Sequence, residues 1–74
     1  MSDINDDILH FAALSRLGDH RVGMLLASNG KLVERARNGG RHYQETVSMI
    51  RDNLQRQIEL RDLDPTGFKF RGHQ

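Results

Sequence analysis

The sequence predicts a small all-α domain built from four helices. Apolar residues recur at helical spacing in four segments, and turns that contain glycine or proline separate these segments. Strand content is expected to be near zero. The chain has 74 residues and no cysteine, so we expect one domain with neither a disulfide framework nor a thiolate metal site. A chain this short buries only about 60% of the surface that its unfolded form exposes, so a partner chain would help to stabilise it.

The first predicted helix spans about residues 4–17. Its apolar residues repeat with a period close to 3.6, and they are Ile4, Ile8, Phe11, Leu14 and Leu17. The start of the chain offers three candidate N-caps, which are Ser2, Asp3 and Asn5. Asp6 and Asp7 in the first turn suit the positive end of the helix dipole. Gly18 is expected to end this helix.

Two short helices are predicted next, at about residues 20–28 and 31–38. Asp19 is expected to cap the first of them, and its inward residues are Val22, Leu25 and Leu26. Asn29 and Gly30 break the helical pattern, since both residue types tolerate a positive φ. The inward residues of the next helix are Leu32, Val33 and Ala36. Gly39 and Gly40 then end it.

The last predicted helix is the longest, at about residues 42–62. One apolar stripe follows it at intervals of three and four residues, through Tyr43, Val47, Ile50, Leu54 and Ile58. Met49 and Leu60 form a weaker second line, which either packs on the short helices and the tail or contacts a second copy of the chain. Pro65 and Gly67 mark a turn. We therefore expect a helical domain at residues 1–64 and a C-terminal tail at 65–74, in which Phe68 and Phe70 form one apolar edge that either folds back on the core or makes a contact.

Positive charge gathers in one part of the chain. Residues 20–41 contain five basic residues and one glutamate, whereas residues 1–19 contain four aspartates and one arginine. An electrostatic footprint for phosphates would lie on this basic stretch.

The same stretch meets the demands of a helix-turn-helix motif. Two helices that cross tightly need a small residue where they approach, and Gly23 and Ala27 can serve there. Glycine inside a helix costs about 1 kcal/mol relative to alanine, so Gly23 calls for a packing reason. Val22 and Leu26 on one helix, and Val33 and Ala36 on the next, can hold the pair to the rest of the domain.

The segment VGMLLASNGKLVERARNGG at residues 22–40, followed by HYQETVSMIRDNL at 42–54, resembles the small phage-repressor-like helix-turn-helix regulators. The order of features carries the resemblance: a helix with small residues, a polar turn, a basic helix that ends at glycine, and a helix with an isoleucine and a leucine inward. Two positions depart from the usual pattern. Ser28 stands where an apolar residue is common, and the turn carries Asn29-Gly30 in place of an earlier glycine.

The resemblance implies a recognition helix that begins near Asn29 and enters the major groove of duplex DNA. Lys31 and Arg35 would donate to guanine, and Asn29 or Asn38 would pair with adenine. Glu34 would accept from cytosine or pair with a neighbouring side chain. The remaining basic residues suit phosphates, and they are Arg21, Arg37 and Arg41. The alternative for every one of these residues is a solvated polar helix face.

The sequence therefore predicts a DNA-binding transcriptional regulator of a bacterium, phage or plasmid, acting in the cytoplasm as a homodimer.

No serine, histidine and acid arrangement for catalysis stands out, and the four histidines show no HxxxH spacing. We therefore expect no enzyme activity, metal, cofactor or small-molecule substrate. The longest apolar stretch, at residues 24–27, is far too short to span a bilayer. The alternative function is a small helical adaptor or inhibitor that binds another protein through Met49, Leu60 and the two tail phenylalanines.

Overall fold

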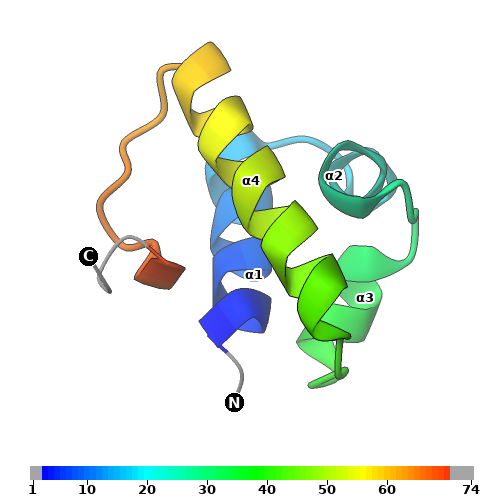
Figure 1. The fold of residues 1–74 in the computed structure, drawn as a ribbon. Coiled ribbons are helices and arrows are strands. Elements are labelled where there is room, and N and C mark those ends of the chain that lie inside the picture. The colour runs from blue at the N-terminus through cyan, green and yellow to red at the C-terminus, as the bar shows by residue number, and fades with distance from the viewer. Residues whose placement is uncertain (1–2, 71–74) are drawn as a thin grey trace.

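The computed structural model describes residues 3–70 and contains four α-helices and no strand within them. The helices are α1 (Asp3–Ser15), α2 (Asp19–Ala27), α3 (Leu32–Arg37) and α4 (Gln44–Leu60). In Figure 1, α4 runs across the front of α1, while α2 is seen almost end-on and so crosses α4 steeply. α3 packs against α1 and α2. The all-α class, the four helices and the long last helix were all predicted correctly.

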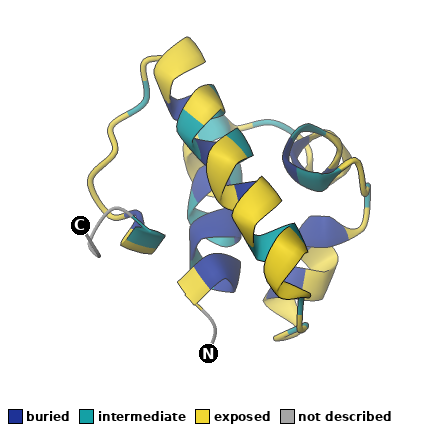
Figure 2. Cartoon of the chain, viewed as in Figure 1, coloured by how far each residue is buried: buried dark blue, intermediate teal, exposed yellow. Residues whose placement is uncertain are grey.

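One apolar core joins the four helices and the tail. The buried apolar residues come from every predicted stripe, and they are Ile4, Ile8, Phe11, Val22, Leu26, Leu32, Val33, Ala36, Ile50, Leu54, Ile58 and Phe68. Figure 2 shows the buried residues facing inward on each helix, with exposed residues along the outer side of α4. The helical spacing therefore identified the inward face of each helix.

Some apolar residues lie elsewhere than the spacing predicted. Tyr43 was placed on the inward stripe of the last helix, but its side chain is 85% exposed. The reason is that α4 begins at Gln44, and Tyr43 precedes it with an extended backbone (φ −65°, ψ 151°), so helical spacing does not apply to it. Leu14 is exposed, and Leu25 and Val47 are half-buried.

The helix ends also differ from the predictions. The first helix ends at Ser15, and Arg16 takes the left-handed conformation (φ 58°), before the expected stop at Gly18. Gly18, not Asp19, is the residue that precedes α2. At the other end of α2, Ser28 has the positive φ (52°) that was expected of Asn29 and Gly30. The Ser28 N–H donates to Met24 O at 3.1 Å, which satisfies a carbonyl of the last turn.

Gly23 lies at a close approach of the chain to itself. A Cβ atom at this position would overlap the carbonyl oxygen of Asn29. The Asn29 N–H donates to Gly23 O at 3.1 Å, so the turn folds directly back on α2. Gly23 was expected to permit a close crossing of two helices; the structure shows that it permits a close approach of the turn backbone. Nearby, Asn53 Nδ2 on α4 donates to Leu26 O at 2.8 Å and joins α4 to the end of α2.

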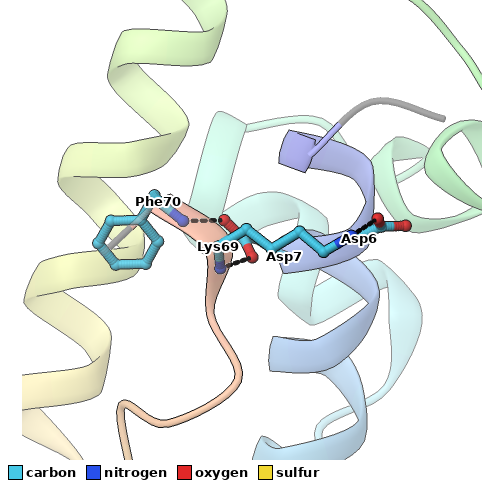
Figure 3. A network of polar contacts seen from close by, with 4 residues as sticks. All are labelled: Asp6, Asp7, Lys69 and Phe70. Atoms are coloured by element: carbon cyan, nitrogen blue, oxygen red, sulfur yellow. Dashed lines mark hydrogen bonds and ion pairs between the residues drawn. The ribbon is translucent and has the colours of Figure 1, made fainter. Parts of the chain in front are cut away.

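The tail folds back on α1. After α4, the chain returns along the molecule to the first turns of α1 (Figure 1). Phe68 enters the core with 4% of its surface exposed, and Phe70 packs against the same core. Figure 3 shows the polar contacts that hold this segment: the carboxylate of Asp7 accepts the N–H groups of Lys69 and Phe70 at 2.6 and 3.0 Å. Of the two arrangements expected for the tail, the structure shows the one that packs on the core.

Two predicted features lie wholly or partly outside the described residues: the candidate N-cap Ser2, and residues 71–74 of the predicted tail. Within residues 3–70, no helix combines the length and the apolar character needed to cross a bilayer.

Candidate functional site

All eight residues predicted to bind DNA are exposed. They occupy α2, the segment 28–31, α3 and the loop after it, and they are Arg21, Asn29, Lys31, Glu34, Arg35, Arg37, Asn38 and Arg41. Leu32, Val33 and Ala36 hold the opposite side of α3 in the core. The structure thus gives α3 one buried face and one polar face.

The loop between α3 and α4 is fixed to α1 by Asn5. Asn5 Nδ2 donates to Gly40 O at 2.8 Å, and Asn5 Oδ1 lies 2.8 Å from His42 Nε2. Because the amide nitrogen faces a carbonyl, the oxygen faces His42, and His42 Nε2 must carry the proton that it donates. Asn5 is 2% exposed, so it is a buried clamp and not the helix cap that was expected. His42, which was placed at the start of the last helix, precedes α4 and is half-buried.

Two adjoining hollows, each of about 250 Å³, lie between α3 and the start of α4. Both are lined by the same four residues, which are Arg35, Arg41, His42 and Tyr43. One of them extends towards α2 and the middle of α4, where its additional lining residues are Ala27, Asn29, Leu32, Thr46 and Met49. Three of the predicted site residues, Asn29, Arg35 and Arg41, therefore share one surface with residues of α4.

The side chain of Arg35 lies over the loop. Gly40 N–H donates to Arg35 O at 2.8 Å, and a Cβ atom at position 40 would overlap Cγ of Arg35. Glycine at position 40 thus leaves the space through which the arginine passes. Burial lowers the pKa of His42, and the nearby Arg35 guanidinium lowers the pKa further. The fixed positive charge of this surface therefore comes from its arginines.

Two of the predicted residues have partners of their own. Arg37 Nη1 lies 3.4 Å from a carboxylate oxygen of Asp19, on α2, so part of its charge is balanced within the chain. Asn29 Oδ1 accepts the N–H of Lys31 at 3.0 Å, just before α3 begins. This leaves the Asn29 amide nitrogen, and not its oxygen, as the group most available to a ligand.

Sequence reasoning identified the arginines of this surface but missed His42 and Tyr43. Both were assigned to the last helix, and the long-range contact of His42 with Asn5 has no local signal in the sequence. One clue was present: His42 and Tyr43 directly follow the Gly39-Gly40-Arg41 segment, where a loop is as natural as a helix start.

The acidic and histidine side chains do not form a metal site in the part of the chain that the structure describes, because no three of them come together. Comparisons with known protein families, curated proteins and solved structures found no match to this chain.

Proposed function

We propose that this chain binds duplex DNA through α2, the segment 28–31 and α3, and that it regulates transcription in the cytoplasm. The observation that carries the proposal is the exposure of five basic residues on this part of the fold and in the loop that follows α3, which are Arg21, Lys31, Arg35, Arg37 and Arg41. Duplex DNA presents a dense row of phosphate charges, and a surface of this kind releases counterions when it binds there. Only the carboxylates of Asp19 and Glu34 lie within the same stretch, and Asp19 is paired with Arg37.

The local geometry supports a helix-turn-helix. α2 and α3 pack on each other and are joined by the four residues 28–31, a length that suits this motif. The close return of the turn at Gly23 sets the direction in which α3 leaves α2. With the apolar face of α3 in the core, Lys31 just before the helix and Glu34 and Arg35 within it are exposed, and these side chains suit contacts with base edges.

The short α3 favours assembly on DNA as a pair. α3 contains 6 residues, so it offers a single turn or two of contacts with bases. One small module of this kind seldom reaches the affinity that a regulator needs against genomic competitors. Two copies related by a two-fold axis would place their α3 helices roughly 34 Å apart and read an inverted repeat. Leu60, 71% exposed near the end of α4, is the apolar residue best placed for the contact between copies, since Phe68 is buried.

The test is a fluorescence anisotropy titration of a labelled duplex taken from the gene's own upstream region, repeated over a range of salt. Arg35→Ala is expected to weaken binding by about 1–3 kcal/mol on the preferred sequence. Arg41→Ala is expected to weaken binding on every duplex and to reduce the slope of log K against log salt by about 0.9. Arg56→Ala, on the exposed side of α4, is the control with the same loss of charge.

The proposal fails if Arg35→Ala and Arg41→Ala both bind DNA as Arg56→Ala does while circular dichroism shows an intact fold. The second candidate function, binding of another protein, then takes its place. It is favoured by the exposure of Met24, Met49 and Leu60. Binding through such apolar side chains would change little with salt, whereas binding to phosphates weakens steeply as salt rises.

A further inference from the structure

The two hollows between α3 and α4 differ in the chemistry of their walls. The hollow bounded only by Arg35, Arg41, His42 and Tyr43 has two cationic side chains and no aliphatic residue in its lining. The hollow that adjoins it adds Leu32 and Met49. Among the described residues, neither hollow is lined by an aspartate or a glutamate. A ligand that fills both would therefore be anionic at one end and flat or apolar at the other.

We propose that these hollows bind one nucleotide, with its phosphate against Arg35 and Arg41 and its base over Leu32 and Met49. Guanidinium groups bind phosphate oxygens through paired, charge-assisted hydrogen bonds. The ring of Tyr43, at the shared edge of the two hollows, supplies a face on which the base stacks. The ligand is either a free nucleotide or an unpaired nucleotide within a strand.

Tyr43 is the residue that the fold does not otherwise explain. It is 85% exposed, it precedes α4 at a position where serine, threonine, asparagine or aspartate is preferred, and its side chain makes no capping hydrogen bond. Its neighbour His42 is held by Asn5, so the backbone that carries Tyr43 is fixed relative to both arginines. Only the side-chain torsions of Tyr43 then have to become ordered when a base stacks on its exposed ring.

The size of the hollows agrees with a nucleotide that spans both. Each measures about 250 Å³, so neither alone reaches the roughly 300–1,000 Å³ of pockets that enclose drug-sized ligands. The site goes beyond the proposed binding of duplex DNA, because paired and stacked bases cannot enter the hollows. A bound nucleotide would occupy Arg35 and Arg41, and so would compete with a duplex for these two side chains.

The experiment uses the ring protons of Tyr43, which is the only tyrosine in a chain without tryptophan. Their NMR signals are followed while the protein is titrated with deoxyadenosine monophosphate, with deoxyadenosine and with inorganic phosphate. Stacking of the base is expected to move the ring signals upfield, and the monophosphate is expected to bind at least about tenfold more tightly than either of its parts. If the monophosphate binds no better than inorganic phosphate, or leaves the Tyr43 signals unmoved, the proposal is wrong.

Variants separate stacking from a general loss of structure. Tyr43→Ala is expected to weaken binding of the monophosphate by at least about fivefold, read from backbone amide signals, because stacking on an aromatic residue is lost. Tyr43→Phe keeps the ring and is expected to bind as the natural chain does. Arg56→Ala is the matched control for Arg35→Ala, which is expected to weaken the monophosphate and inorganic phosphate alike. Equal affinities for Tyr43→Ala and Tyr43→Phe would overturn the role of the ring.

Two further arms distinguish the source of the nucleotide. A short single-stranded oligodeoxyadenylate that moves the Tyr43 signals at lower concentration than the monophosphate indicates an unpaired nucleotide within a strand. Equal or tighter binding of the monophosphate indicates a free nucleotide. The duplex titration described above serves as an independent measurement. If the chain binds the monophosphate but no duplex, the nucleotide site stands and the proposed function is wrong. If it binds duplex DNA but not the monophosphate, the proposed function stands and the nucleotide site is wrong.

Discussion

Asn5 and Asp7 lie two residues apart on α1, and each fixes a distant segment of the chain to that helix. Asn5 holds the loop before α4 through Gly40 and His42, and Asp7 holds the tail through the N–H groups of Lys69 and Phe70. Both side chains are buried, with exposures of 2% and 1%. The segments that they hold differ in what they present. The loop carries exposed Arg41 and Tyr43, whereas the tail places Phe68 in the core.

The difference teaches that one helix supports two separate tasks from different faces, because residues two apart in a helix do not point the same way. A carboxamide both donates and accepts, so Asn5 satisfies a carbonyl and a ring nitrogen at once. A carboxylate only accepts, so Asp7 suits two backbone N–H groups that have no helical partner. The adjacent ion pair between Lys69 and Asp6 adds charge balance at the tail, and the hydrogen bond that Lys69 Nζ donates to the Asp6 carboxylate raises the pKa of Lys69. The tail contact thus stabilises the core, and the loop contact positions the candidate site.

The largest difference between the two regions is expected in the free energy of unfolding when their aromatic residues are replaced by alanine. Phe68→Ala should lower the free energy of unfolding by about 3–5 kcal/mol, because it empties a buried site. Tyr43→Ala should change the same quantity by less than about 0.5 kcal/mol, since its ring lies in solvent. Urea denaturation followed by circular dichroism measures both. Similar losses in the two variants would show that the loop carries as much of the core as the tail does.

Asp7→Ala should have the next largest effect and lower the free energy of unfolding by about 3 kcal/mol in the same measurement. It removes two hydrogen bonds to a charged group and leaves the N–H groups of Lys69 and Phe70 without their acceptor. Asp52→Ala is the matched control, because Asp52 is an exposed aspartate on α4. If the two alanine variants unfold at the same urea concentration, the tail is not held by Asp7.

Asn5→Ala should lower the free energy of unfolding by about 2 kcal/mol, since Gly40 O and His42 each lose a partner. It should also weaken binding of DNA and of the nucleotide, because the loop that carries Arg41 and Tyr43 is released. Asp7→Ala, studied at low temperature where it stays folded, should bind both as the natural chain does. A binding defect in Asp7→Ala equal to that of Asn5→Ala would remove the distinction between the two regions.

The contacts of Asn5 and Asp7 also mark the limit of what the sequence could predict. Helical spacing located Ile8, Ile50 and Leu54 in the core because an amphipathic helix repeats its pattern locally. The partners of Asn5 lie 35 and 37 residues away, and those of Asp7 lie 62 and 63 residues away. A polar residue in the first turn of a helix looks the same in sequence whether it caps the helix or holds a remote segment.

The candidate site was predictable in its charges but not in its shape. The basic residues follow one another along residues 20–41, so their clustering is visible in the sequence. The hollow beside α4 depends on where that helix begins, and helix ends are the part of an element that spacing defines least well. Tyr43 was assigned to the core because it lies four residues before Val47 and so extends the apolar stripe of the last helix. The actual start of α4 at Gln44 reverses its assignment from buried to exposed.

The smallest expected effect is a decrease in the free energy of unfolding with acid that arises from His42, in the loop before α4. Burial and the Arg35 guanidinium lower the pKa of His42 below its ordinary value of 6.5, so the folded chain takes up a proton at this site less readily than the unfolded chain. Above pH 6.5 the ring is neutral in both states, and its contribution to stability is fully present. As the pH falls from 6.5 towards the lowered pKa of the folded state, the unfolded chain is protonated first, and this contribution is lost.

His42→Gln isolates this contribution, because the Gln side-chain amide stays neutral and can still donate to Asn5 Oδ1. The free energy of unfolding, measured in urea on both sides of pH 6.5, should fall more steeply with acid in the natural chain than in His42→Gln. His20→Gln, at an exposed histidine in α2, is the matched control for the substitution itself. Identical slopes for the natural chain and His42→Gln would show that the ring is as accessible to protons in the folded loop as in the unfolded chain.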